Sequence, residues 1–278
     1  MREATASFQL DRAELVAEAD RLAETYRNAM PFPHIVIDGL LPGFLLDDVL
    51  AEYPEPEDAP WQSFDNTREL KLALADIELM GPATRHVLAL LNSQTFIDFL
   101  EHLTGIDGLI PDPHYTGGGL HQIRRGGFLK VHADFNRHER LKLDRRLNVL
   151  VYLNHDWEES YGGHLELWDT EMTACVERVL PLFGRMVVFS TTDFSHHGHP
   201  DPLACPEQRA RRSLAWYYYT NGRPAEEVSS SHTTTFRARP GEDMRRSWRD
   251  VASRWVPPVI YDAARRVRAR MRGRATDS

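Results

Sequence analysis

The chain is poor in cysteine, in long apolar runs and in positive charge, and each shortage excludes a class of protein. Two cysteines, Cys175 and Cys205, are too few for a disulfide framework and fit a reducing compartment. Apolar runs are short, and residues 1–30 carry acids and bases throughout, so we expect neither a signal peptide nor a membrane span. We therefore expect a cytoplasmic protein.

The balance of charge also limits the partners. The net charge of −8 argues against nucleic acid as the main substrate. Residues 236–278 differ from the rest, with 12 Arg against 5 acidic residues. Within them, residues 259–271 place apolar side chains at helical spacing beside arginines, which predicts a basic amphipathic helix. We expect this helix to dock on the acidic body; an anionic partner or weak contact with a membrane surface are the alternatives.

The chain does contain histidine and aspartate side chains in an order that suits a metal site. His132 and Asp134 flank Ala133 at the end of an alternating apolar run, residues 128–133. In a strand, residues two apart point to the same side, so this histidine and carboxylate can meet one ion. A histidine cluster follows at residues 196–199. Two imidazoles and a carboxylate leave three positions open on octahedral iron, which indicates chemistry rather than a closed structural site.

The His-x-Asp triplet alone is weak evidence, because a second one, His199-Pro200-Asp201, occurs in the same chain. Chance predicts about one such triplet at this composition. We rank the second triplet lower, since Pro200 interrupts a strand and residues 200–206 have loop composition.

The pattern around the first triplet is typical of a β structure. Residues 147–153 form an apolar strand in which Asn148, Leu150 and Tyr152 share one face, so Tyr152 can point toward the metal. Gly162 and Gly163 precede a strand at 164–168, residues 181–184 form a turn, and further strands follow at 186–189 and 213–220.

With these motifs in place, residues 109–224 resemble the 2-oxoglutarate and Fe(II)-dependent dioxygenases, in particular the prolyl 4-hydroxylase-like branch. The matching motifs are VHAD (131–134), YLNHDW (152–157), GGHLELW (162–168), the P-x-x-G-x-x-V-x-F pattern (181–189), HGHP (197–200) and RRSLAWYY (211–218).

The resemblance implies a role for five side chains. His132, Asp134 and His197 would bind Fe(II), Arg211 would hold the distal carboxylate of 2-oxoglutarate, and the hydroxyl of Tyr152 would also contact this co-substrate. Arginine suits a carboxylate because its planar fork makes two charge-assisted hydrogen bonds.

Two of these assignments have close competitors. Arg211 is preferred to Arg212 because it alternates with small residues on one strand face, and Arg209 is the fallback. His197 is preferred to His196 as the distal ligand; the two neighbours point to opposite sides of a regular strand, so only one of them can bind the ion.

The expected fold is α+β with a mainly β core: a double-stranded β-helix, or cupin-like jelly roll, braced by N-terminal helices. We divide the chain into a helical supporting region (1–108), the jelly-roll core (109–224) and a basic tail with a helix (225–278). Helices are predicted at 11–29, 43–53 and 82–104, with a strand at 34–37.

Residues 61–80 are interpreted as a surface loop, with a lid that contacts substrate as the alternative. His121, Asn148 and Trp61 are candidates for lining the substrate pocket, and a structural histidine is an equal alternative for His121.

The resemblance implies an oxygenase that uses O2 and 2-oxoglutarate, with ascorbate as reductant, and releases succinate and CO2. The substrate would be an amino-acid residue of prolyl type, free or in a peptide, or a small metabolite. The carboxylate of Asp134 favours hydroxylation over halogenation. The rivals are a cupin-type metal enzyme that does not use 2-oxoglutarate and a non-catalytic jelly-roll interaction protein. The sequence leaves the oligomeric state open.

Overall fold

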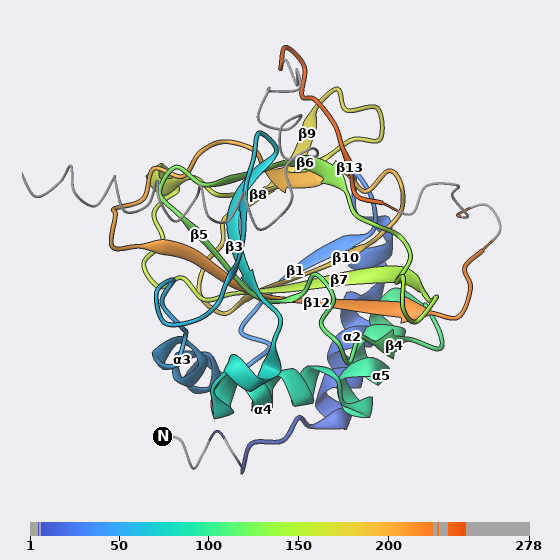
Figure 1. Cartoon of the computed structure of the whole chain (residues 1–278). Coiled ribbons are helices and arrows are strands. Elements are labelled where there is room, and N and C mark those ends of the chain that lie inside the picture. The colour runs from blue at the N-terminus through green and yellow to red at the C-terminus, as the bar shows by residue number, and fades with distance from the viewer. Residues whose placement is uncertain (1–4, 6, 225–226, 228–232, 243–278) are drawn as a thin grey trace, which may run out of the picture.

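The computed structural model describes residue 5, residues 7–224, residue 227 and residues 233–242 (Figure 1). Its helices are α2 (Arg12–Asn28), α3 (Gly43–Ala51), α4 (Pro82–Leu91) and α5 (Gln94–Thr104), with short 3-10 turns at Ile77–Leu79 and Glu159–Tyr161. Its strands are β1 (His34–Asp38), β2 (Gln62–Asp65), β3 (Glu69–Leu74), β4 (Ile110–Pro111), β5 (Gly119–Arg124), β6 (Phe128–Ala133), β7 (Asp144–Tyr152), β8 (Leu165–Trp168), β9 (Cys175–Val179), β10 (Arg185–Ser190), β11 (His197–His199), β12 (Ala210–Thr220) and β13 (Thr235–Phe236).

Local signals explain where the helices begin and end. The side chain of Asp11 accepts a hydrogen bond from the Glu14 amide and starts α2. The sequence predicts a single helix over residues 82–104, but the structure has two. Asn92 ends α4, and the hydroxyl of Ser93 accepts from the Phe96 amide and starts α5. Short polar side chains favour caps over helix interiors, which is why the helix breaks here.

The strands form one antiparallel sheet that curls into a nearly closed barrel. Their order is β1-β10-β7-β12-β5-β3-β6-β11-β8-β9, with β2, β4 and β13 attached at the side. In Figure 1 the helices lie beneath the layer formed by β1, β10, β7 and β12. This is the predicted double-stranded β-helix braced by N-terminal helices.

Side-chain alternation divides the lower layer into two faces. Val149 and Val151 of β7 and Trp216 of β12 pack against the helices in the main hydrophobic core. Tyr152 points the other way, into the barrel, where it packs against Phe189 and neighbouring apolar side chains. The inward direction predicted for Tyr152 is therefore confirmed.

The interpretation of residues 61–80 as a surface loop is wrong. Residues in this segment form the β2–β3 hairpin, in which β3 pairs with β5 through Ala73 and His121 and with β6 through Glu69 and Leu129. β3 thus fills the seam between β5 and β6 and completes the barrel wall. The backbone hydrogen bonds of two distant strands hold it there, which a local pattern does not reveal.

Residues beyond the boundary predicted at 224 contact the described core. β13 pairs with β6, with Phe236 opposite His132, and Arg239 forms an ion pair with Asp201. β13 therefore extends the barrel wall beside β6. The predicted basic helix at 259–271 lies outside the described residues. No helix in the described part of the chain is long and apolar enough to cross a lipid bilayer.

Candidate metal centre and active site

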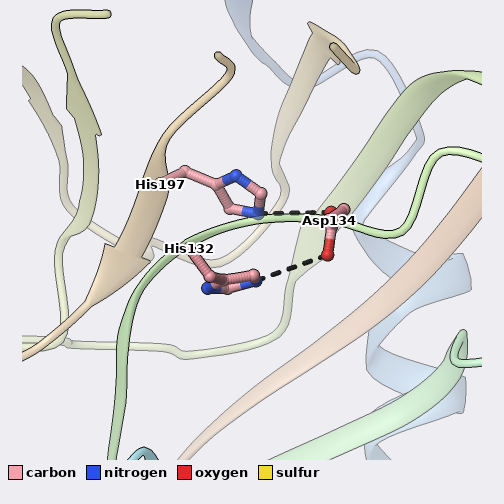
Figure 2. A group of neighbouring side chains, drawn as sticks. All are labelled: His132, Asp134 and His197. Atoms are coloured by element: carbon pink, nitrogen blue, oxygen red, sulfur yellow. Dashed lines mark ion pairs between the residues drawn. The ribbon is translucent and has the colours of Figure 1, made fainter. Parts of the chain in front are cut away.

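Two paired strands bring a histidine, a carboxylate and a second histidine together inside the barrel (Figure 2). His132 is the last residue but one of β6, and Asp134 directly follows the strand. The antiparallel pairing of β6 with β11 places His197 directly opposite His132. One ligand atom from each of the three side chains lies within 4.8 Å of the others. The Nε2 atoms of His132 and His197 are 3.3 and 3.4 Å from the two carboxylate oxygens of Asp134.

Backbone carbonyls fix the tautomers of both histidines. Nδ1 of His132 lies 2.9 Å from the carbonyl oxygen of Lys130, and Nδ1 of His197 lies 2.9 Å from that of Ser195. A carbonyl oxygen only accepts, so each Nδ1 carries the proton and each Nε2 offers a lone pair toward the other ligands. The donor set therefore fits a divalent metal ion held on one face.

The carboxylate of Asp134 is oriented from behind by two side chains of β7. Nη2 of Arg145 and Nδ2 of Asn148 donate to the same Oδ2 atom at 2.9 and 2.7 Å, and Arg145 also donates to the amide oxygen of Asn148. Burial opposes ionisation of Asp134. The pKa of Asp134 nevertheless lies well below the ordinary value, and the positive charge of the Arg145 guanidinium is the strongest cause. Asp134 is therefore ionised and ready to bind a cation.

Sequence reasoning missed Arg145, although it is fully buried with its guanidinium carbon 3.4 Å from the centroid of the Tyr217 ring. Asn148 and Tyr152 face inward, so regular alternation along β7 would place Arg145 on the outer face. The register between β7 and β12 shifts between Tyr218 and Tyr219, at the end where Arg145 lies. Such an irregularity leaves no clear trace in the local sequence.

Arg211 and Tyr152 form a second group of polar side chains inside the barrel. Arg211 is 4% exposed, and its Nη2 donates to the Tyr152 hydroxyl at 3.1 Å while its Nε donates to the Gly163 carbonyl at 2.7 Å. A Cβ on Gly163 would lie 2.6 Å from Leu203 and 3.0 Å from Cδ of Arg211, so only glycine admits the arginine here.

The two competing arginines lie elsewhere. Arg212 faces outward, where it makes an ion pair with Glu55 at 2.6 Å and lies over the Tyr53 ring. Arg209 donates to the carbonyl of His155 near the surface. Of the three arginines, Arg211 is thus the one inside the barrel.

A cavity of about 370 Å³ opens beside His132 and Asp134. Its walls come from the β2–β3 hairpin, the turn before β5, the end of β6 and β13. They include Gln62, Phe64, Glu69, Lys71, Ala73, Leu74, Asp76, Gly117, Gly118, His121, Leu129, Phe135, Tyr217, Thr234 and Phe236. Arg211 and Tyr152 do not line it; they are buried within the barrel.

The structure places the three residues expected in the substrate pocket in three different positions. His121 does line the cavity; burial and the nearby charge of Lys71 lower its pKa to about 3. Asn148 lies behind Asp134 instead, where it binds the carboxylate. Trp61 is not in the lining: its ring stacks on Tyr53 and its N–H donates to the Glu55 carbonyl.

The second His-x-Asp triplet does not form a site. His199 is buried in the barrel, whereas Asp201 makes an ion pair with Arg239 at 2.7 Å. The turn at Pro200 separates them, as expected. His196 lies just before β11 and is not part of the three-residue ligand group.

This geometry defines a class of protein: a double-stranded β-helix that carries a metal centre of two histidines and one carboxylate. Comparison with known proteins narrows that class. Residues 118–219 match the family described as the 2OG-Fe(II) oxygenase superfamily. No curated protein matches the chain.

Solved structures show the same fold. A Pseudomonas putida prolyl-4-hydroxylase matches with a TM-score of 0.54 and 20% identity, covering 75% of this chain and 100% of that one. A Trichoplax adhaerens prolyl hydroxylase, solved with a hypoxia inducible factor peptide, gives a TM-score of 0.56 at 16% identity, covering 77% and 94%. A Phytophthora capsici prolyl 4-hydroxylase gives 0.53 at 19%, covering 77% and 67%. At these identities the likeness establishes the fold alone.

Residues 118–219 therefore form a 2OG-Fe(II) oxygenase domain, which is an enzyme domain of the dioxygenase class. The fold is prolyl 4-hydroxylase-like. The expected family, fold and enzyme class are confirmed. The two histidines and the aspartate fit the Fe(II) that this family uses.

Proposed function

We propose that the protein hydroxylates an unactivated C–H bond of an amino-acid residue or small metabolite, using Fe(II) and 2-oxoglutarate. The observation that carries the proposal is the convergence of His132, Asp134 and His197 in the same barrel interior that holds Arg211. Fe(II) and 2-oxoglutarate supply the oxidising chemistry when bound: O2 and the co-substrate are consumed, and succinate and CO2 are released.

The side chains of the metal centre have two roles, which follow from where they lie. His132, Asp134 and His197 hold the metal on one face, and Arg145 and Asn148 keep the carboxylate in its orientation. Because these ligands would hold one face of the metal, its opposite face would stay open to exchangeable groups.

Arg211 and Tyr152 provide the site for the distal carboxylate of 2-oxoglutarate. Arg211 uses Nε for Gly163 and one Nη2 hydrogen for Tyr152, so three of its five N–H groups stay available for a carboxylate. Because the Tyr152 oxygen accepts from Arg211, its own hydrogen is free to donate to the same anion.

The cavity beside His132 is the substrate side of the proposal. Phe64, Phe135 and Phe236 give it apolar walls that exclude water, while Glu69 and Lys71, paired at 3.1 Å, give it polar groups. A mainly apolar pocket with few polar groups orients a small molecule or one side chain of a peptide.

Succinate formation tests the proposal. The protein is loaded with Fe(II) without oxygen, then given 2-oxoglutarate, ascorbate and air, with and without a metabolite extract. We expect succinate in the wild type, more of it with the extract, and none in His132→Ala or Asp134→Ala. Both variants should lose metal binding while keeping the wild-type circular dichroism spectrum. Turnover retained by either variant would contradict the assigned centre.

Arg211→Leu separates this reading from a cupin-type metal enzyme and from a non-catalytic protein. Our proposal predicts lost 2-oxoglutarate affinity with metal affinity retained. Arg212→Leu is the matched control, because that arginine faces outward on the same strand. Equal 2-oxoglutarate binding by Arg211→Leu and wild type would favour the cupin-type enzyme, and no binding by any form would favour the non-catalytic protein.

A further inference from the structure

His199 is a buried side chain that is not one of the proposed metal ligands. It follows His197 by two residues on β11, and it is 3% exposed. Neither ring nitrogen has a hydrogen-bond partner among the described residues. An imidazole carries at least one N–H in either protonation state, and a buried donor without an acceptor costs free energy. Buried polar groups are normally paired, so an unpaired one in an enzyme interior points to a missing ligand.

The surroundings of His199 indicate what kind of ligand is missing. The cations that act on its ring are Arg211 and Lys71, both of which are hydrogen-bond donors. His199 therefore lies in the part of the barrel shared by the carboxylate-binding arginine and the metal ligands. Donors gathered around a buried donor repel one another unless an anion lies between them.

We infer that His199 is a positioning residue for the co-substrate, and that its N–H donates to the distal carboxylate held by Arg211. The inference rests on the proposed function. A carboxylate offers about four lone-pair sites, and Arg211 and Tyr152 together do not fill them all. A third donor satisfies the anion and pairs the buried imidazole in the same step.

The roles of its two neighbours distinguish His199 from an ordinary structural histidine. His132 and His197 each have one nitrogen bonded to a backbone carbonyl, which fixes their rings before any ligand arrives. The ring of His199 has no such bond. Its orientation is therefore left to the ligand.

The test is calorimetric binding of 2-oxoglutarate to the Mn²⁺-loaded protein without oxygen. Mn²⁺ takes the same type of ligands as Fe(II) but does not turn over. In His199→Leu we expect Kd for 2-oxoglutarate to rise on the order of tenfold to a hundredfold, as for a lost hydrogen bond to a charged group. Affinity for Mn²⁺ should stay at the wild-type value.

Two further variants separate a ligand contact from a structural role. His199→Gln keeps an N–H donor and should bind 2-oxoglutarate within a few-fold of wild type. His196 is equally buried and its ring nitrogens are likewise unpaired, but it lies just before β11 and outside the ligand group, so His196→Leu should leave Kd unchanged. Without ligand, His199→Leu should melt no lower than wild type, because it removes an unpaired buried polar group. A structural role would lower the melting temperature of both His199 variants.

A 2-oxo acid without a distal carboxylate, 2-oxobutyrate, identifies the atom that is bound. Wild type and His199→Leu should bind 2-oxobutyrate equally weakly. Unchanged 2-oxoglutarate affinity in His199→Leu, or reduced Mn²⁺ affinity instead, overturns the inference while leaving the proposed function intact. A wild-type protein that binds Mn²⁺ but no 2-oxoglutarate overturns both.

Discussion

Replacing Arg145 with methionine removes the only buried positive charge that contacts Asp134 within the described residues. The pair is well protected from water, with side chains 1% and 13% exposed and atoms 2.9 Å apart. Breaking a buried pair by removing one partner typically costs 3–5 kcal/mol, and the partial exposure of Asp134 favours the lower end. We expect the metal-free variant to lose about 3 kcal/mol of unfolding free energy.

Arg146→Met provides the matched control. This arginine is the next residue of β7, but its partner is the half-exposed Glu227 at 3.5 Å. A pair of this kind contributes about 1 kcal/mol or less. Urea unfolding at neutral pH, with chelator present, measures both variants.

A double-mutant cycle with Asp134→Asn isolates the charge pair. In that background Arg145 is an unpaired buried cation, so Arg145→Met should be neutral or stabilising. The wild-type pKa of Asp134 is lowered, so the pair stabilises the protein above the unfolded pKa of about 4 and loses this contribution as the pH falls. The cost of Arg145→Met should thus be constant above that pH and shrink below it. Equal costs of Arg145→Met with and without the Asp134 charge would refute the reasoning.

Two more predictions concern the metal and co-substrate sites. His197→Ala should abolish Mn²⁺ binding measured by calorimetry, whereas His196→Ala should retain it; the reverse would reassign the third ligand. Gly163→Ala should raise Kd for 2-oxoglutarate on the order of tenfold, because its Cβ would lie 3.0 Å from Cδ of Arg211. Gly162→Ala has a similar positive φ but no atom within 4 Å, so it shares the backbone strain and should leave Kd unchanged.

The candidate metal ligands could be predicted because their geometry is largely local. His132 and Asp134 are two residues apart at a strand end, and the backbone of a strand puts such residues on one side whatever surrounds it. The same period directed Arg211 inward and Arg212 outward. The helices followed from their apolar spacing, although the break at Asn92 and Ser93 was missed because continuous apolar spacing across it outweighed the cap signal.

The features that only the tertiary structure decided all depend on segments far apart in the chain. The β2–β3 hairpin is a wall rather than a loop because β5 and β6 leave a seam that its backbone can fill. Phe236 reaches the cavity because β13 pairs with β6.

Arg145 and His199 show the same limit at the level of single side chains. Arg145 turns inward through an irregular register, and His199 is notable because its nitrogens find no acceptor. Sequence by itself determined the class of chemistry and the side of each strand that carries it, since strand periodicity is a property of the backbone. Which polar groups find partners inside the barrel is settled by long-range packing, and it appears only when the whole fold is assembled.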